Sequence, residues 1–337
     1  MKRLMILCGM LPFMFAACEV EFDPNSEWKE TTIVYCLLDQ DDDTTFVRVE
    51  KAFLGEGNYI DFAKVKDSIY YKEDDLDVKI YGYNSWDNVN PAQVIPFQYT
   101  TDYAKPEGEF YSAEAPIYYA LTAGQFNINR TYKLEVRNVK TGNVVSSTLQ
   151  PLGNYTITKP ENNKFSFKYD KGKYKMDIQW NNRNSSSPGA MPKLYQPVFR
   201  FYYKEHNEER FVDLPLGKVV NTYPTTHSLY YTASLDGILS AIKARLNNGQ
   251  PKAWTDRINW MELFLTSCDV TMYDYININN ADNNLLTDRP LYTNIDNGIG
   301  LFAARRTKIN VVFTDYPVDA RAAFMDGLVA LGIGFEQ

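Results

Sequence analysis

The 337-residue chain is poor in the side chains that most metal and hydrolytic sites use. It contains only two histidines and four cysteines. Neither His206 nor His227 lies near another metal-type residue in the sequence, whereas zinc sites gather such ligands in clusters. The sequence also has no G-x-S-x-G elbow, no Walker loop and no H-E-x-x-H motif. We therefore predict no catalytic residues, no metal site, no cofactor and a non-enzymatic protein.

The chain also has fewer basic residues than acidic ones. The chain has 35 Lys and Arg against 42 Asp and Glu, a formal net charge of -7. Binding to phosphate backbones needs clustered basic residues, so we expect no nucleic-acid partner. Carboxylates are plentiful, but nothing in the sequence selects a glycosidase pair. The aspartates of 39–43 lack the glycine and the closing glutamate of an EF-hand, so they predict a charged hairpin turn.

Long apolar runs are limited to one stretch near the start. Lys2 and Arg3 precede an apolar segment over 4–17, which is shorter than the roughly 20 residues of a spanning helix. Two alanines then lie directly before Cys18. This order of charge, apolar residues and small residues predicts a secretory signal. It resembles the bacterial lipoprotein box, which implies that Cys18 is diacylated; an ordinary signal peptide with an incidental cysteine is the alternative.

The rest of the chain divides into a tether and two larger parts. Residues 1–18 are the predicted signal peptide and lipobox, and the acidic segment 19–30 is the predicted tether. Acidic residues just after a lipidated cysteine resemble the export signal of Bacteroidota-type surface lipoproteins. Pro151, Gly153 and Pro160 then indicate a boundary near 152. We expect an immunoglobulin-like β-sandwich over 31–152 and a second, β-rich domain over 153–337.

Hydrophobic periodicity predicts a mainly β fold with two β-sandwich-like domains of immunoglobulin or fibronectin type. Apolar and polar residues alternate over 76–81, 132–137 and 174–180, as in strands with one buried face. The segment 258–278 also reads as strand-rich. Helical spacing appears near 234–248, where Ser234 can cap the helix, and near 317–331, where Pro317 opens the segment.

Aromatic residues are abundant, with 25 Tyr, 19 Phe and 5 Trp. Core packing and cross-strand pairs are the favoured explanation, and ring platforms for sugars are the alternative. Cys8 leaves with the leader and Cys18 is predicted to be lipidated, so Cys36 and Cys268 remain. Export would allow these two to form a disulfide, and two buried thiols are the alternative.

The sharpest local motif is Asn297-Gly298-Ile299-Gly300, which follows Asn294-Ile295 late in the chain. We expect positive φ at Asn297 and Gly298, and a close approach of backbone at Gly300. A packed β-turn is favoured over a ligand site. Together with the lipobox and the predicted sandwich, the motif resembles a family of Bacteroidota-type lipoproteins catalogued only as a domain of unknown function. That family has an immunoglobulin-like N-terminal domain.

The resemblance implies an outer-membrane lipoprotein that often accompanies a TonB-dependent transporter. We therefore expect a lipid-anchored binding or accessory protein on the cell surface, or otherwise on the periplasmic face, that helps to capture a nutrient. Its ligand would be a glycan or a peptide. A surface adhesin or fimbrillin-like subunit is the alternative, and a secreted hydrolase is the least favoured.

Overall fold

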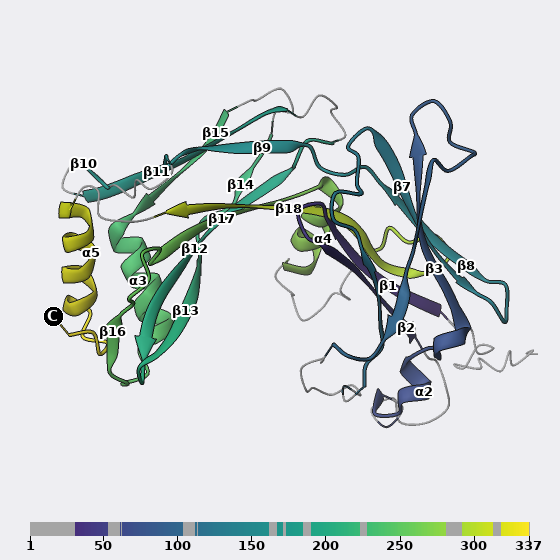
Figure 1. Ribbon diagram of the computed structural model, residues 1–337, viewed down its shortest axis with the longest axis horizontal. Coiled ribbons are helices and arrows are strands. Elements are labelled where there is room, and N and C mark those ends of the chain that lie inside the picture. The colour runs from purple at the N-terminus through teal and green to yellow at the C-terminus, as the bar shows by residue number, and fades with distance from the viewer. Residues whose placement is uncertain are drawn as a thin grey trace, which may run out of the picture.

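The computed structural model describes residues 31–52, 61, 63–103, 112, 114–161, 167–170, 173–184, 190–222, 228–280, 292–312 and 318–336. The predicted signal, the tether and Cys18 lie outside these residues. The chain is mainly β and builds two lobes that long strands join (Figure 1). The predicted fold class, with sandwich-like packing of several sheets and few short helices, is confirmed.

The first lobe is a sandwich of two sheets. One sheet has the order β4-β3-β7-β8, and the other belongs to a ten-stranded sheet. The alternating segments predicted over 76–81 and 132–137 are β3 and β7, which pair antiparallel. The strands are β1 (Thr31–Asp39), β2 (Thr44–Ala52), β3 (Leu76–Asn84), β4 (Gln93–Pro96), β5 (Gln98–Thr100), β6 (Ile117–Leu121), β7 (Arg130–Asn138) and β8 (Val144–Leu149). Two short helices, α2 (Lys66–Ile69) and η1 (Glu73–Asp75), precede β3.

The second lobe packs the other part of the ten-stranded sheet against the sheet β10-β11-β15, in which β9 also pairs with β11. The predicted strand over 174–180 lies in β11. The strands are β9 (Asn154–Lys159), β10 (Lys168–Asp170), β11 (Lys173–Asn184), β12 (Leu194–Glu205), β13 (Glu208–Pro215), β14 (Val219–Val220), β15 (Ser228–Ser234), β16 (Lys252–Trp254), β17 (Met261–Cys268) and β18 (Ile299–Val312).

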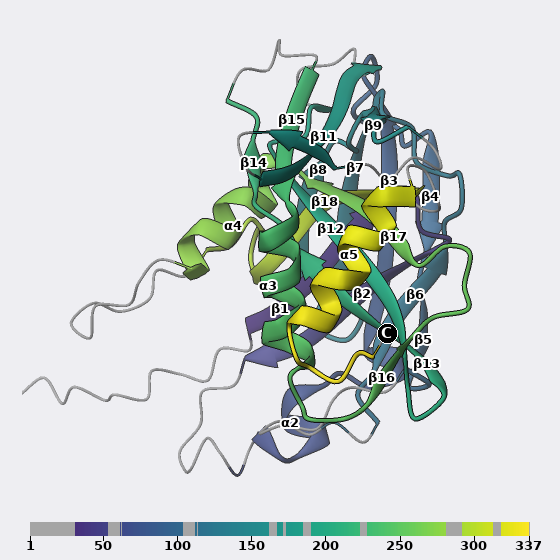
Figure 2. The same cartoon turned by 90° about the vertical axis from the view of Figure 1, so that its left-hand side faces the viewer.

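Helices cover one end of the second lobe. The helix predicted near 234–248 is α3 (Leu235–Leu246), and the Oγ of Ser234 accepts a hydrogen bond from the Gly237 N–H at 3.1 Å. α5 (Val318–Ala330) corresponds to the helix predicted near 317–331. Figure 2 shows α3 and α5 side by side at this end. Both helices contribute buried side chains to the core of the second lobe, among them Ile238 and Ile242 of α3 and Phe324 and Leu328 of α5.

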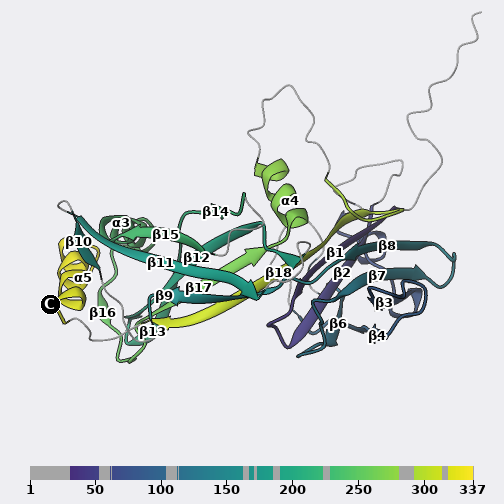
Figure 3. The ribbon, with the colours of Figure 1, turned by 90° about the horizontal axis from the view of Figure 1, so that it is seen from above.

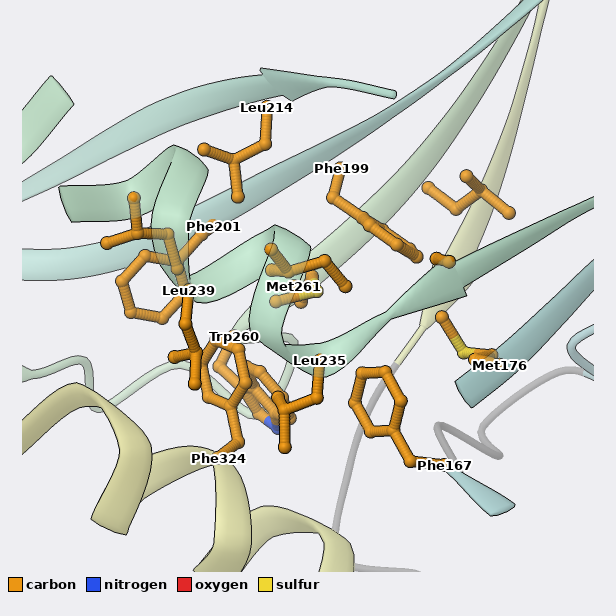
Figure 4. Close-up of a cluster of buried hydrophobic side chains, with 14 of the residues drawn as sticks. Phe167, Met176, Phe199, Phe201, Leu214, Leu235, Leu239, Trp260, Met261 and Phe324 are labelled. Carbon is orange, nitrogen blue, oxygen red and sulfur yellow. The ribbon is translucent and has the colours of Figure 1, made fainter. Parts of the chain in front are cut away.

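Each lobe has its own hydrophobic core, and the core of the second lobe is rich in aromatic rings. In the second lobe, Phe201 and Trp260 meet Phe324 of α5 with ring centroids 5.6 and 5.1 Å apart (Figure 4). In the first lobe the core contains alternate residues of β1, β2, β3 and β7. Burying such side chains contributes roughly 1.5–3 kcal/mol each, which makes these cores the main source of stability.

The strand β18 passes through both lobes. Its residues 299–305 pair parallel with β1, and its residues 305–312 pair antiparallel with β17. The ten-stranded sheet, of order β13-β12-β17-β18-β1-β2-β6-β5 with β14 and β16 also paired to β12, is therefore shared by the two lobes. Ile295, Phe302 and Ala304 belong to the core of the first lobe. The structure thus differs from the predicted boundary, because segment 292–304 completes the part assigned to 31–152.

Residues 270–280 differ from the prediction in another way. The sequence predicts strands over 258–278, and the structure has β17 followed by the helix α4 (Val270–Asn280). The expectation of strand is wrong for this helix, whose valine, threonine, isoleucine and tyrosine side chains favour strands intrinsically. Figure 3 shows that α4 projects from the side of the molecule away from β3 and β4.

Candidate functional site

The ten-stranded sheet has one covered face and one open face. In β1, Val34, Cys36 and Leu38 enter the core of the first lobe, so Tyr35 and Leu37 between them lie on the opposite face. Tyr35 is 38% exposed. In β2 the same alternation places Phe46 and Arg48 on this side. We call this side of the sheet the open face.

The helix α4 lies on the open face and packs against β17 and β18. Asp269 fixes its start. The Oδ1 of Asp269 accepts a hydrogen bond from the Met272 N–H at 2.8 Å, and its Oδ2 accepts one from the Ala304 N–H of β18 at 2.9 Å. One carboxylate therefore caps the helix and also holds it to the sheet.

A groove of about 310 Å³ lies between α4 and the strands of the open face. Such a volume is at the small end of ligand pockets, which are typically apolar with a few polar groups. The side chains of Tyr35 and Tyr275 both line it and lie close enough for Tyr275 to influence the pKa of Tyr35. The lining residues that carry side chains of functional interest are Tyr35, Leu37, Phe46, Arg48, Met272 and Tyr275.

Aromatic rings continue from this groove along the open face. Phe46 meets Tyr103 edge-on with centroids 4.8 Å apart, and Tyr103 lies 6.3 Å from Tyr119. Burial raises the pKa of Tyr35, and the neighbouring Tyr275 and Glu50 raise it further. Its phenol therefore stays a neutral hydrogen-bonding group at pH 7. The aromatic open face can bind an apolar or ring-shaped surface.

Arg48 is a charged residue that lines the groove. Its Nη1 lies 3.8 Å from Glu50 Oε1, and its side chain is 34% exposed. An ion pair as exposed as this is weak, so the guanidinium can exchange partners at small cost. Arg48 can therefore donate hydrogen bonds to a ligand beside the aromatic rings.

The Asn-Gly-Ile-Gly motif contacts β8 on the covered side of the ten-stranded sheet. The side chain of Asn294 donates to the Phe302 carbonyl at 2.8 Å and accepts from the Phe302 N–H at 2.9 Å. Asp296 exchanges two backbone hydrogen bonds with Ser146 of β8. The motif thus ties β18 to the facing sheet, which agrees with the predicted packed turn.

The backbone of the motif partly corrects the prediction. Asn297 has positive φ, at 58°, as predicted, but Gly298 does not. Gly298 is needed for space, because a Cβ there would lie 2.8 Å from the Thr32 carbonyl oxygen. Gly300 has φ of +126°, and a Cβ there would lie 1.9 Å from the Val34 carbonyl oxygen. The predicted close approach at Gly300 is confirmed.

The acidic turn after β1 is neutralised by the protein itself. Arg306 donates two hydrogen bonds to Asp41, at 2.8 and 3.0 Å, and Lys308 donates a third at 2.9 Å. Arg305 pairs with Asp39 at 3.0 Å. These cations of β18 therefore already pair with the carboxylates of the turn. Within the described ranges, no group of three or more His, Cys, Asp or Glu side chains could hold a metal ion.

The possible disulfide between Cys36 and Cys268 is not formed, and the other interpretation, two separate buried thiols, is the one that the structure has. Cys36 pairs with Phe302 on one edge of β18, and Cys268 pairs with Arg305 on the other. The two cysteines are therefore two strand spacings apart, about 10 Å, and three residues apart along β18, again about 10 Å. A disulfide needs Cα atoms within about 7 Å. Burial raises the pKa of both thiols, that of Cys268 to about 12.

Sequence reasoning missed the groove, although part of its signal is visible. The alternation of β1 and β2 places Tyr35 and Phe46 on the face opposite Val34 and Val47, and an aromatic at an outward position is such a signal. Tyr275 could not be assigned to the same site because α4 was not predicted. Cys18, the predicted lipidation site, lies in the part of the chain that the structure leaves undescribed.

No family model matches the chain, and no curated protein matches it. Of the helices that the structure describes, none has the length and apolar character to cross a membrane.

Proposed function

We propose that the chain is a non-enzymatic, lipid-anchored binding protein of the outer membrane that works with a TonB-dependent transporter in nutrient capture. The observation that carries the proposal is the aromatic groove between α4 and the open face. The order of Lys2, Arg3, the apolar segment 4–17 and Cys18 supports the anchor. Two acyl chains on one cysteine would give stable attachment, since one chain alone binds membranes only reversibly.

The groove suits the binding of a ligand or partner more than it suits catalysis. Large aromatic rings provide contact area with little loss of side-chain entropy, and Arg48 adds a directional donor. Asp269 fixes α4 at its N-terminal end, so the groove walls are held in place before binding. Preorganisation of this kind raises affinity because less conformational freedom is lost on association.

Capture from native outer membranes tests the proposal. A tagged wild-type chain, solubilised in detergent, should co-purify with a TonB-dependent transporter. Phe46→Ala and Tyr275→Ala should reduce recovery by about ten-fold or more, since buried aromatic anchors dominate interface energies. Trp86→Ala is the matched control, because Trp86 is an aromatic of the first lobe that is 81% exposed away from the groove. Circular dichroism melts would confirm that each variant is folded.

Three outcomes would contradict parts of this proposal. Groove variants that recover the transporter as well as wild type would exclude the groove as the contact. A Cys18→Ser chain that still fractionates with the outer membrane would exclude the anchor. Ladders of polymers that survive mild denaturant, with no transporter recovered, would favour the adhesin or fimbrillin-like subunit.

A further inference from the structure

A second cavity, which we call the junction pocket, lies where the two lobes meet. It has a volume of about 300 Å³. Its wall combines the end of β8, the segment 191–193 before β12, Asn221 and Thr222 after β14, and residues 269–271 at the start of α4. Ligand sites occur preferentially at such meeting points of structural units. The junction pocket shares no lining residue with the groove of the open face.

One side of the junction pocket is formed by Lys193 and Asn221. The Nζ of Lys193 donates to the Asn221 carbonyl at 3.3 Å and lies 5.6 Å from the ring centroid of Tyr273. An ammonium has three donors, so this arrangement leaves capacity for a ligand oxygen. Asn221 is only 5% exposed, and its Nδ2 donates to the Pro192 carbonyl at 3.4 Å.

The side-chain oxygen of Asn221 is the unusual feature of the junction pocket. Among the described residues, its Oδ1 is buried and has no hydrogen-bond partner. A buried acceptor without a donor costs free energy, so a native structure normally supplies a protein group, a water or a ligand there. The Oδ1 has no accessible surface in this conformation, so the Asn221 side chain, which lines the pocket, would have to turn for a ligand hydroxyl to supply the missing donor.

The junction pocket also carries negative charge. Asp269 lines it and is 9% exposed, with each carboxylate oxygen already accepting one backbone N–H. A carboxylate has about four acceptor positions, so it can accept more. In the described part of the chain, no ion pair joins Lys193 to Asp269. The pocket therefore holds one positive and one negative group that do not neutralise each other directly.

This balance selects against charged ligands. An anion would be attracted by Lys193 and repelled by Asp269, and a cation would meet the reverse. A hydroxyl both donates and accepts, so it can serve Asn221, Lys193 and Asp269 in turn, and the threonines at 148, 222 and 271 offer further hydroxyl groups. We propose that the junction pocket binds a neutral polyhydroxylated ligand, a sugar residue.

Titration calorimetry on the full chain tests the assignment. The probes are a panel of neutral hexoses and disaccharides, together with glucuronate, glucosamine and glycine, each at up to about 10 mM. At least one neutral sugar should bind, and glucuronate, glucosamine and glycine should bind about ten-fold more weakly or not at all. Asn221→Leu and Lys193→Met should each weaken binding of that sugar by about ten-fold. Lys243→Met, an exposed lysine of α3, is the matched control and should bind as wild type does.

Several results would overturn the proposal. These are no binding by any neutral sugar, equal or tighter binding of a charged probe or of glycine, and wild-type affinity in both Asn221→Leu and Lys193→Met. Lys193→Met decides the outcome if Asn221→Leu does not fold, because Lys193 is only partly buried and makes no ion pair in the described structure. Failure of the transporter capture experiment would leave this result unaffected, because no groove residue takes part.

Discussion

At Gly300 the backbone of β18 passes so close to β1 that no side chain fits. Gly300 lies opposite Val34 in the parallel pair, and its φ of +126° is one that residues with a Cβ rarely adopt. Gly298 faces the Thr32 carbonyl in a similar way without positive φ. Gly300 is therefore required both for its backbone conformation and for space, whereas Gly298 is required for space alone. The spacing of the two glycines in the sequence does not reveal this difference.

Gly300→Ala should lower the free energy of unfolding by about 2–5 kcal/mol, because backbone strain and overpacking both contribute. Gly142→Ala is the control: Gly142 has φ of +77°, but a Cβ there would meet nothing within 4 Å. Its cost should be about 1 kcal/mol, from conformation alone. Urea denaturation measures both. Equal losses in the two variants would show that the contact with β1 is not the constraint.

Among the elements, the sequence predicts those whose side chains and local signals agree. In α3, apolar residues recur at helical spacing and Ser234 supplies the cap, so local and tertiary preferences coincide. In α4 they conflict, because its β-branched and aromatic residues favour a strand. Capping by Asp269 and packing against β18 decide the outcome. The sequence did not predict the groove, because one of its walls is α4, whose residues locally favour a strand.

Asp269, which caps α4, should make the free energy of unfolding depend on pH. Burial raises the pKa of Asp269 to about 6, although the N–H groups of Met272 and Ala304 act in the opposite direction. In the unfolded chain the carboxyl has its ordinary, lower pKa, so the folded state binds more protons between about pH 4 and pH 6. The contribution of Asp269 to the free energy of unfolding should therefore fall as pH rises through this window, by up to about 3 kcal/mol, and level off above it.

Urea denaturation of wild type and Asp269→Asn across this pH range measures the effect. Other carboxyl groups titrate in both proteins and cancel in the difference. The stability of wild type relative to the variant should decrease from pH 4 to pH 6. A difference that stays constant, or that grows with pH, would contradict the role of burial at this carboxyl group.

At the scale of the whole molecule, β18 joins two hydrophobic cores that the sequence predicts to be separate domains. Within each lobe the alternation of β3, β7 and β11 was enough to predict strands. The partner of β1 was not predictable in the same way, because Asp39 and Arg305 are 266 residues apart in the chain. No local pattern specifies a pairing at that distance. The shared sheet and the pocket between the lobes both depend on it.

A strand common to both cores should make the lobes unfold together. Leu134→Ala removes a side chain of the first core that is 1% exposed, at a cost of about 2–5 kcal/mol. Trp180 and Trp260 lie in the second core and report on it by fluorescence. The midpoint of the urea transition followed by tryptophan fluorescence should fall in Leu134→Ala. It should stay unchanged in Val89→Ala, because the Val89 side chain is 77% exposed. A fluorescence midpoint unaffected by Leu134→Ala would mean that the lobes unfold independently.

The parallel pairing of β1 with β18 also sets an order of events during synthesis. A chain made from its N-terminus forms β1 early, but β18 exists only after most of the chain is complete. Until then one edge of β1 presents unpaired N–H and C=O groups, which can pair with another chain. Contacts so distant in sequence also form slowly, because a long loop must close first. Pairing with β18, the last strand in the described part of the chain, therefore ends the aggregation risk at this edge of β1.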